Sequence, residues 1–370
     1  MSWSDVAKLM NSELNQDCSP NKYRKEFTRK FKYIKSTVDF SNKETADEEL
    51  LLKINEQLTQ IRREKTALTD LRRDANAQLR RVDREQNIID IAKEFAKEMS
   101  RNKNKYKLSV PKYNGATDNT GLLLLSDWHY DEVVDEAFNY YDKEVCKEYL
   151  QIILAKTIDI IHKENLNSLY VFNLGDLISG RIHTQLRIQS QIDVVSQVME
   201  VSEILYNFLM ELSQYCKIEY YDCLDNHSRI EPNKKESIQL ESFARITHWY
   251  LNSMCDKYRI TVHQNNSLDI IHECINGWDV VGVHGDKDSP ATITRNMSSL
   301  LGARPDLIVM AHRHHFSCDE ENKCIVVCNP SLMGADDYAL GQRKTSSSAQ
   351  TLIVLSEDNP AKQIYRLLVN

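Results

Sequence analysis

Five short segments after residue 120 of the sequence carry residue types that bind transition-metal ions. They hold Asp127 and His129, then Asp176, then Asn226 and His227, then His284, and finally His312 and His314. Each follows an apolar run of the kind that forms a buried strand; the first run is four leucines at positions 122–125. Carboxylate, imidazole and carboxamide donors together favour Mn, Fe or Zn over Mg or Ca. One such segment would mean little, but five in one domain predict a metal site.

The predicted strands should bring these side chains together. Alternation along an extended chain would place Asp127 and His129 on the same side of the backbone. The five segments supply enough donors for two ions, and a carboxylate can bridge two ions about 3.5–4 Å apart. We therefore expect a site with two divalent ions where the strands end.

From about residue 120 the sequence alternates between predicted strands and helices. Strands are expected at residues 122–125, 169–173, 218–223, 270–274, 280–283, 307–311, 325–328, 351–355 and 363–368, and helices at 143–163, 189–214, 235–258 and 291–301. Asn276-Gly277 predicts a tight hairpin turn between two of the strands. Strand–helix–strand units followed by hairpins predict an α/β (α+β) domain over residues 113–370, with two packed β-sheets flanked by helices.

Residues 1–43 are predicted to form a small helical unit. Two short helices flank a turn at Cys18-Ser-Pro-Asn, and Ser2 or Ser4 would cap the first helix. The second helix carries Lys and Arg along one face, at Arg24, Lys25, Arg29, Lys30, Lys32 and Lys35. The arrangement resembles a helix-turn-helix that binds DNA, although a solvated helix would carry the same charges.

Residues 44–104 contain neither Gly nor Pro and are predicted to form a long helix. One heptad column is apolar throughout and the paired column only partly so, which indicates a coiled coil of moderate quality or a hairpin folded near residues 70–76. This segment, with a linker to residue 112, would act as a spacer or as a rod that joins two or more copies of the chain.

Charge and cysteine content limit the class of protein. Lys and Arg outnumber Asp and Glu by 25 to 18 in residues 1–112, whereas the remainder has 22 against 36. A basic front end on an acidic body favours a DNA-facing module joined to a second unit. No apolar run of about 18 residues and no signal peptide are present, so we expect no membrane span and a cytoplasmic location. The nine cysteines form no C-x-x-C pair and are expected to be free thiols.

The five segments resemble the motifs of the calcineurin-like metallophosphoesterase superfamily. Its motifs, in order, are D-x-H, G-D-x-x-x-G, G-N-H-D/E, a lone H, and G-H-x-H. In the same order this chain has Asp127-Trp-His129, Gly175-Asp176-Leu-Ile-Ser-Gly180, Asp225-Asn226-His227-Ser228, His284, and Ala311-His312-Arg-His314. Asn329-Pro330-Ser331 also looks like the loop that follows the last motif in that superfamily. The resemblance covers residues 120–335; Asp225, Ser228 and Ala311 depart from the superfamily's pattern.

The resemblance implies a role for each residue. Asp127, His129, Asp176 and His314 would hold a first ion, and Asn226, His284 and His312 would hold a second, with Asp176 bridging the two. His315 could replace His314, but the spacing favours His314. The catalytic residues would be Asp176 and His227, with His227 facing the phosphate to stabilise the transition state or protonate the leaving oxygen. The ions would be Mn²⁺, with Fe, Zn and Ni as alternatives.

The loops beside the motifs contain candidate substrate contacts at Arg181, His183 and Arg229, for which solvated surface charge is the alternative. The motif spacing and the basic N-terminal part look like the nuclease subunit of DNA double-strand-break repair complexes. The N-terminal arrangement also looks like phage or prophage proteins with this domain.

The resemblance therefore implies a metal-dependent DNA exo- or endonuclease, acting by attack of hydroxide in the cytoplasm of a bacterial host or phage-infected cell. Two alternatives remain open. One is a phosphodiesterase or phosphatase for a small nucleotide or phosphoprotein. The other is a DNA-binding assembly protein whose metal domain is catalytically weak.

Overall fold

A computed structural model describes residues 2–14, 16–37, 118–136, 138–182, 184–265, 267–335, 343 and 345–369 of the chain. The chain divides into two compact units, residues 1–83 and 84–370. The predicted long helix and the linker after it lie outside the described residues. The division into segments 1–43, 44–112 and 113–370 therefore stays a prediction. Among the helices that the structure describes, none has the length and apolar character needed to span a membrane.

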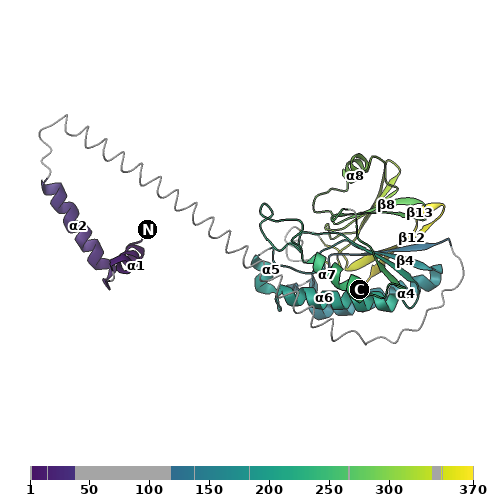
Figure 1. Cartoon of the computed structure of the whole chain (residues 1–370), viewed down its shortest axis with the longest axis horizontal. Coiled ribbons are helices and arrows are strands. Elements are labelled where there is room, and N and C mark those ends of the chain that lie inside the picture. Colours follow the sequence, from purple (N-terminus) through teal and green to yellow (C-terminus); the bar gives the residue numbers. More distant parts are fainter. Residues whose placement is uncertain are drawn as a thin grey trace. The chain divides into compact units, whose positions relative to one another are not determined.

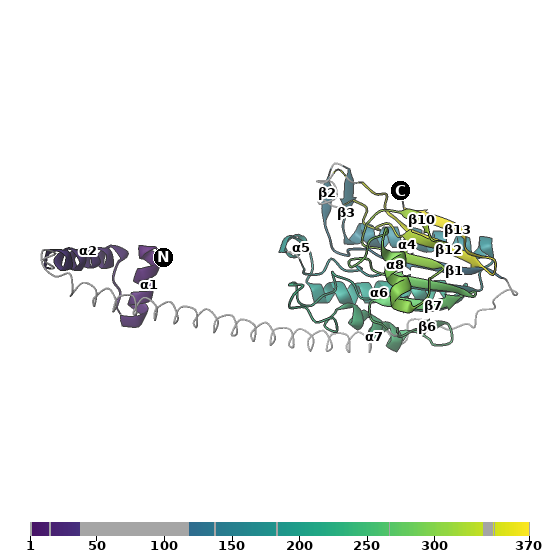
Figure 2. The same ribbon diagram turned by 90° about the horizontal axis from the view of Figure 1, so that it is seen from above.

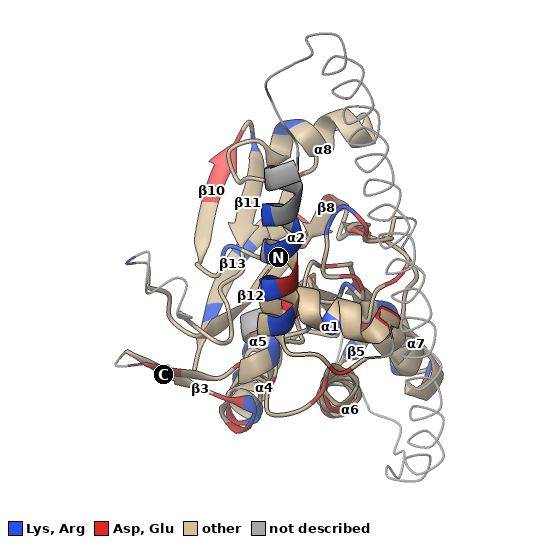
Figure 3. Ribbon diagram, turned by 90° about the vertical axis from the view of Figure 1, so that its left-hand side faces the viewer, with Lys and Arg blue, Asp and Glu red and all other residues tan. Residues whose placement is uncertain are grey.

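The first unit contains two helices, α1 (Trp3–Leu14) and α2 (Pro20–Thr37). Ser2 caps α1: the Asp5 N–H donates to the Ser2 hydroxyl oxygen at 3.3 Å, and the Ser2 N–H donates to the Asp5 carboxylate at 2.9 Å. In Figure 3 the blue stretches of the α2 ribbon mark its Lys and Arg residues, and those that are exposed include Arg24, Lys25, Arg29, Lys30 and Lys32. Binding of DNA by this unit stays a prediction.

The first sheet of the second unit holds the strand on which the candidate site depends. Its strand order is β13 (Asn359–Leu368), β12 (Ala349–Ser356), β1 (Thr120–Leu125), β4 (Ser168–Asn173), β5 (Lys217–Asp222) and β6 (Ile260–Val262). Strands β1, β4, β5 and β6 run parallel, whereas β12 and β13 run antiparallel to their neighbours. All six residues of β1 are buried, because apolar layers cover both faces of this sheet.

The second sheet has the order β10 (Ser317–Glu321), β11 (Cys324–Cys328), β9 (Leu307–Met310), β8 (Trp278–Val283) and β7 (Ile270–Ile275). The predicted turn between β7 and β8 is confirmed: Asn276 and Gly277 both have positive φ, 53° and 85°, as a tight hairpin turn requires. A small separate hairpin, β2 (Val134–Glu136) with β3 (Asn139–Tyr141), was not predicted.

Helices cover the outer faces of the two sheets (Figures 1 and 2). On the first sheet lie α4 (Lys143–Glu164), α6 (Val194–Leu212) and α7 (Ala244–Met254), and on the second lies α8 (Ile293–Leu301). A short helix, α5 (Thr184–Gln189), precedes α6. An apolar layer that includes Leu122, Leu124, Val280 and Val309 fills the space between the sheets. The predicted pair of packed sheets flanked by helices is therefore present. All nine cysteines are free thiols, as predicted.

Two helices differ from the sequence prediction. Residues 235–243, predicted as helix, form a loop instead: the N–H of Phe243 donates to the Ser228 carbonyl at 2.7 Å, and the N–H of Ile230 donates to the Glu241 carbonyl at 3.2 Å. Backbone bonds to the preceding segment thus replace the first turns of the helix. Helix α6 begins at Val194 and not at residue 189, because the Asp193 side chain caps it.

We expect Asp193→Ala to lower the free energy of unfolding by about 1 kcal/mol at neutral pH. The Asp193 carboxylate accepts hydrogen bonds from the N–H groups of Val195 (2.9 Å) and Ser196 (3.1 Å), which alanine cannot replace. Asp193→Asn keeps an acceptor and is the matched control. Urea unfolding of the three proteins measures the difference.

The pH dependence of this difference has a defined sign. Burial raises the pKa of Asp193, but the hydrogen bonds from Ser196 and Val195 outweigh it and hold the pKa below its usual value. A depressed pKa in the folded state stabilises the protein above the unfolded-chain pKa, and that contribution disappears as pH falls through the folded-state pKa. A difference between wild type and Asp193→Ala that stays constant from neutral pH to below the unfolded-chain pKa would contradict this assignment.

Candidate metal centre

The candidate ligands lie on loops that follow the carboxyl ends of β1, β4, β5, β8 and β9. The loops after β1 and β4 are joined by backbone hydrogen bonds: the N–H of Asp127 donates to the Gly175 carbonyl, and that of His129 donates to the Asp176 carbonyl, each at 3.0 Å. These backbone bonds alone fix the positions of three candidate ligands, Asp127, His129 and Asp176, relative to one another.

Five candidate ligands have left-handed backbone conformations. The φ angles are 51° at Asp127, 44° at His129, 52° at Asp176, 67° at His312 and 59° at His314. Such conformations are uncommon for residues other than glycine and cost about 1–3 kcal/mol each. The predicted reason for the approach of Asp127 and His129, strand alternation, is therefore wrong. The two side chains do meet, with His129 Nε2 3.9 Å from Asp127 Oδ1, but in a loop beyond the end of β1.

Two glycines allow these loops to come close together. Gly180 has φ of 73°, and a Cβ atom there would lie 2.2 Å from the His227 carbonyl oxygen. Gly175 has φ of 94°, and its Cβ would lie 2.4 Å from that of Asp225. Asp225 in turn accepts hydrogen bonds from the N–H (2.6 Å) and hydroxyl (2.9 Å) of Ser228. Asp225 and Ser228, the two residues around Asn226-His227 that differ from the superfamily's pattern, are thus hydrogen-bonded to each other, in space that is open because Gly175 has no side chain.

The carboxylate of Asp127 is held from one side. The Ser126 hydroxyl donates to Asp127 Oδ2 at 2.6 Å, and Asn329 Nδ2 donates to that hydroxyl oxygen at 2.8 Å. The Ser331 hydroxyl donates to the Asp127 carbonyl at 3.0 Å. The Asn-Pro-Ser segment at residues 329–331 therefore supports the first candidate ligand. The other carboxylate oxygen, Asp127 Oδ1, is buried and accepts no hydrogen bond from the described residues.

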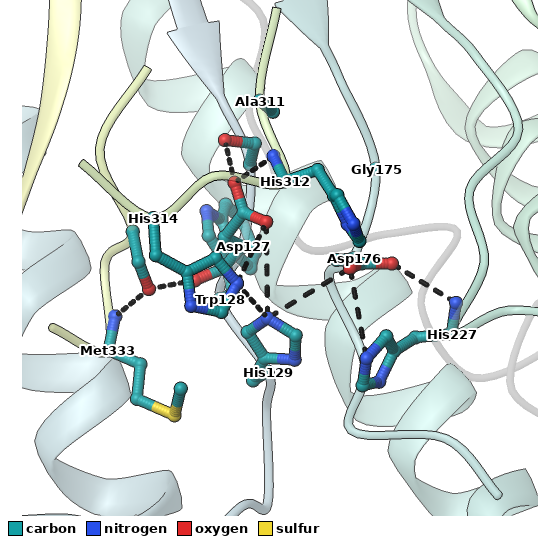
Figure 4. A network of polar contacts seen from close by, with 12 residues as sticks. Asp127, Trp128, His129, Gly175, Asp176, His227, Ala311, His312, His314 and Met333 are labelled. Carbon is teal, nitrogen blue, oxygen red and sulfur yellow. Dashed lines mark hydrogen bonds and ion pairs between the residues drawn. The ribbon is translucent and has the colours of Figure 1, made fainter. Parts of the chain in front are cut away.

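Asp127, His129 and His314 form the first group of converging donor atoms (Figure 4). His314 Nε2 lies 3.4 Å from Asp127 Oδ1 and 3.1 Å from His129 Nε2. Two imidazole nitrogens bound to one ion at about 2.1 Å, with an angle of about 95–110° between them, would be about 3.1–3.4 Å apart. The geometry therefore fits an ion. The structure brings His314 into this group, whereas the exposed His315 turns its Nδ1 to the Arg313 carbonyl at 2.9 Å.

Asp176, His284 and His312 form the second group, and Asn226 adjoins it. The Nδ1–H of His284 donates to the Leu174 carbonyl at 2.7 Å, which leaves Nε2 facing the site. That nitrogen lies 2.7 Å from Asn226 Oδ1 and 3.2 Å from Asp176 Oδ2. Because all three atoms carry lone pairs, their approach requires a positive charge between them. Asp176 Oδ2 is itself buried without a hydrogen-bond donor among the residues that the structure describes.

The pKa values of His284 and Asp176 reflect this need for a positive charge in the second group. Burial lowers the pKa of His284, but the neighbouring carboxylates, Asp176 foremost, outweigh burial and raise the pKa to about 10. A proton on Nε2 then serves as the positive charge. Burial alone would raise the pKa of Asp176, but the charges of His227 and His284 hold it well below its usual value. Asp176 is therefore a carboxylate at neutral pH, the form that binds metal ions.

The pKa shifts of three further candidate ligands, His129, His312 and Asp127, favour the forms that bind metal ions. Burial and the charges of His227 and His314 hold the pKa of His129 well below its usual value. Burial and His284 likewise lower the pKa of His312. For Asp127, burial acts to raise the pKa, but His314 outweighs it and the pKa is lowered. Neutral imidazoles and ionised carboxylates are the states in which these groups coordinate metals.

His227 is oriented by a contact that the sequence did not reveal. Its ring Nδ1–H donates to the Ser179 carbonyl at 2.7 Å, and its backbone N–H donates to Asp176 Oδ1 at 3.1 Å (Figure 4). The ring therefore turns Nε2 toward the cluster, 3.9 Å from Asp176 Oδ2. His129, Asp176 and His227 also meet the geometry of a ligand group, so the position of His227 suits either a ligand or a proton donor.

The structure describes two of the three predicted substrate contacts, Arg181 and Arg229. His183 lies outside the described residues. Arg181 and Arg229 are both partly buried, next to Gly180 and Ser228 respectively, and the Arg229 Nε atom has no hydrogen-bond acceptor among the described residues. Contact of either arginine with a substrate stays a prediction.

Sequence reasoning missed Glu132, which is buried beside the first group. Its Oε2 atom lies 3.6 Å from His129 Nδ1, and the N–H of Glu132 donates to the His129 carbonyl at 2.9 Å. Carboxylates commonly orient metal-binding imidazoles from the far side of the ring. The signal in the sequence was an acid three residues after a candidate histidine ligand.

Comparisons with known proteins add relatives of low similarity. The SPbeta prophage-derived uncharacterized protein YonJ of Bacillus subtilis (strain 168) is 22% identical over 357 residues, covering 92% of this chain and 85% of that protein. No family model matches the chain. Among solved structures, an archaeal phosphodiesterase is 12% identical with a TM-score of 0.34, and the match covers 67% of this chain and 99% of that protein.

A second solved structure, vacuolar protein sorting 29 of Cryptosporidium parvum, is 12% identical with a TM-score of 0.33, covering 65% of this chain and 87% of its own. A zinc complex of Vps29 from Entamoeba histolytica is 9% identical with a TM-score of 0.30, covering 68% of this chain and 99% of its own. Scores this low carry no conclusion about activity.

We expect Mn²⁺ to raise the melting temperature of the protein, because ions that bind only the folded state stabilise it by about 2.7 kcal/mol at one hundred times their Kd. Asp176→Asn and Asp127→Asn should abolish most of the rise. The control His272→Gln removes an exposed histidine whose Nε2 pairs with Asp279, outside the cluster, and should leave the rise unchanged. Differential scanning fluorimetry with and without EDTA measures the effect; an undiminished rise in Asp176→Asn would rule out the assigned ligands.

We further expect Gly180→Ala to destabilise the protein and weaken Mn²⁺ binding, because the added Cβ would displace the His227 carbonyl. Gly277→Ala is the matched control: its φ of 85° imposes similar strain, but nothing lies within 4 Å of the added Cβ. The control should lose only the strain energy, about 1 kcal/mol, with Mn²⁺ affinity intact. Equal effects of the two substitutions on Mn²⁺ titrations would show that the close approach at Gly180 is unimportant.

Proposed function

We propose that this chain is a phosphodiesterase that uses two divalent ions, and that it hydrolyses DNA. One observation carries the proposal: Asp127 Oδ1 and Asp176 Oδ2 are buried without hydrogen-bond donors among the described residues, and imidazoles surround them. Buried carboxylates are stable only when a positive charge or donor compensates them. Mixed N and O donors of this kind suit Mn²⁺, with Fe, Zn and Ni as alternatives.

The residues of the cluster have distinct roles in the proposed reaction. Asp127, His129 and His314 would hold one ion, Asn226, His284 and His312 the other, and Asp176 would contact both. When bound, such ions polarise phosphoryl oxygens and make hydroxide available near neutral pH. His227, held by Ser179, would direct Nε2 toward the phosphate and donate a hydrogen bond or proton to the leaving oxygen.

Arg229 would add a charge-assisted contact to the phosphate, two residues from His227. Its buried Nε lacks an acceptor in the described part of the chain, so a bound phosphate would supply the missing partner. Arg181 and His183 would extend the same rim.

DNA is proposed as the substrate because of the N-terminal unit. Exposed Lys and Arg residues along α2 supply the positive charge that holds a polyanion. The predicted rod over residues 44–104 would let two copies of the chain act on one DNA. A relative whose name records a prophage origin supports an action in the cytoplasm of a bacterial or phage-infected cell.

A small phosphodiester is the second candidate, and one observation favours it. A cleft adjoins His284, and its lining carries three carboxylates, of Asp269, Asp286 and Asp288, against one ammonium group, that of Lys287. Carboxylates in this position repel a polyanion that would cross this side of the site.

Purified protein with Mn²⁺ is tested on labelled single- and double-stranded DNA and on bis-p-nitrophenyl phosphate. We expect cleavage of DNA and of the small diester, with Asp176→Ala reducing both by about three orders of magnitude or more, because it removes the shared ligand. His272→Gln is the matched control and should retain wild-type rates.

The other outcomes separate the alternatives. Hydrolysis of the small diester with intact DNA would overturn the DNA substrate and favour the second candidate. No hydrolysis of any phosphoester, together with salt-sensitive retention of DNA, would leave a DNA-binding assembly protein with a weak metal domain.

A further inference from the structure

The small hairpin β2–β3 is bonded to the loops of the first ligand group. The Tyr141 hydroxyl donates to the carbonyl of Trp128, the residue between Asp127 and His129. Asn139 Nδ2 donates to the carbonyls of Met333 (3.0 Å) and Ala335 (2.8 Å), in the segment that follows Ser331. One face of the hairpin is thus fixed to the metal-binding loop and to the segment that supports it.

The opposite face of the hairpin presents two aromatic rings. Asn139 and Tyr141 turn toward the body of the unit, so Tyr140, which lies between them in β3, turns away, and Phe138 lies in the turn just before β3. Phe138 is 87% exposed and Tyr140 is 56% exposed. The Tyr140 hydroxyl donates to the Asp142 carboxylate at 2.9 Å, which steadies its ring. Figure 2 shows the hairpin projecting from the rest of the unit.

The charge beside these rings limits what they can contact. Asp135 and Glu136 are exposed on the neighbouring strand β2. Carboxylates repel the phosphate backbone of any DNA, so contact with DNA at this face would come from its bases and not from its phosphates. Unpaired bases instead offer flat, uncharged faces that stack on Phe and Tyr, and such stacking does not require a particular base.

We propose that Phe138 and Tyr140 stack on unpaired nucleobases of the DNA strand whose phosphodiester lies at the metal centre. This inference rests on the proposed function and narrows its substrate to single-stranded DNA or frayed ends. The rigid attachment of the hairpin to the loops of Asp127 and His129 would fix the distance from the stacked bases to the bond that is cleaved.

The test compares two Mn²⁺-dependent substrates of equal length: an oligothymidylate of about 15 nucleotides and an abasic oligonucleotide with the same sugar-phosphate backbone. Phe138→Ala with Tyr140→Ala should lower kcat/KM for oligothymidylate about tenfold or more, because each base–aromatic stack is lost. The abasic substrate, which has no bases to stack, should be cleaved at the wild-type rate. Phe138→Trp and Tyr140→Phe keep the rings and are the controls.

The outcomes distinguish a failure of the stacking role from a failure of the proposed nuclease function. If wild type cleaves both oligonucleotides and the double variant loses nothing, or loses equally on both, the stacking role is overturned while the nuclease stands. If wild type cleaves duplex DNA but neither oligonucleotide, the inference is overturned and the proposed function stands, whereas failure to cleave any DNA overturns the proposed function itself. An unchanged Mn²⁺-dependent melting temperature in the double variant shows that the metal centre is intact.

Discussion

The structure depends on one electrostatic constraint, the burial of two carboxylates that face a shared set of imidazole nitrogens. Asp127 Oδ1 and Asp176 Oδ2 receive no hydrogen bond within the described part of the chain. Without a cation, the high pKa of His284 shows that a proton supplies the compensating charge. A divalent ion in that place would bring more charge and satisfy more lone pairs than one proton. The sheets and loops around the cluster hold these donors in positions that a positive charge among them makes favourable.

Backbone strain is concentrated where the constraint is strongest. Left-handed conformations at residues such as Asp127, Asp176 and His312 cost about 1–3 kcal/mol each, and strain of this kind collects at functional sites. Hydrogen bonds between neighbouring loops and the close approach at Gly180 hold these conformations in place. The support comes from the surrounding protein, so the ligands are positioned before an ion arrives, and less binding energy is spent on ordering them.

Much of the second unit could be predicted from sequence because its strands are short apolar runs that end in polar residues. The run at 122–125 predicted β1, and the residues after it predicted the first ligands. The conformations of those ligands could not be predicted, because left-handed backbone depends on contacts with distant loops. The contact of His227 with the Ser179 carbonyl was hidden for the same reason, since a backbone acceptor leaves no sequence signal. Strands of three residues, such as β2, are too short to show a period.

The antiparallel neighbour of β1 has a consequence for how the protein is made. Gln350, in β12, accepts a hydrogen bond from the Ser126 N–H at 2.8 Å and donates one to the Pro330 carbonyl at 3.0 Å. Gln350, 224 positions after Ser126, thus holds the residue that precedes Asp127. A nascent polypeptide that still lacks β12 cannot make this contact, so the candidate metal centre would be completed only late in translation. Contacts of such long sequence separation also slow folding.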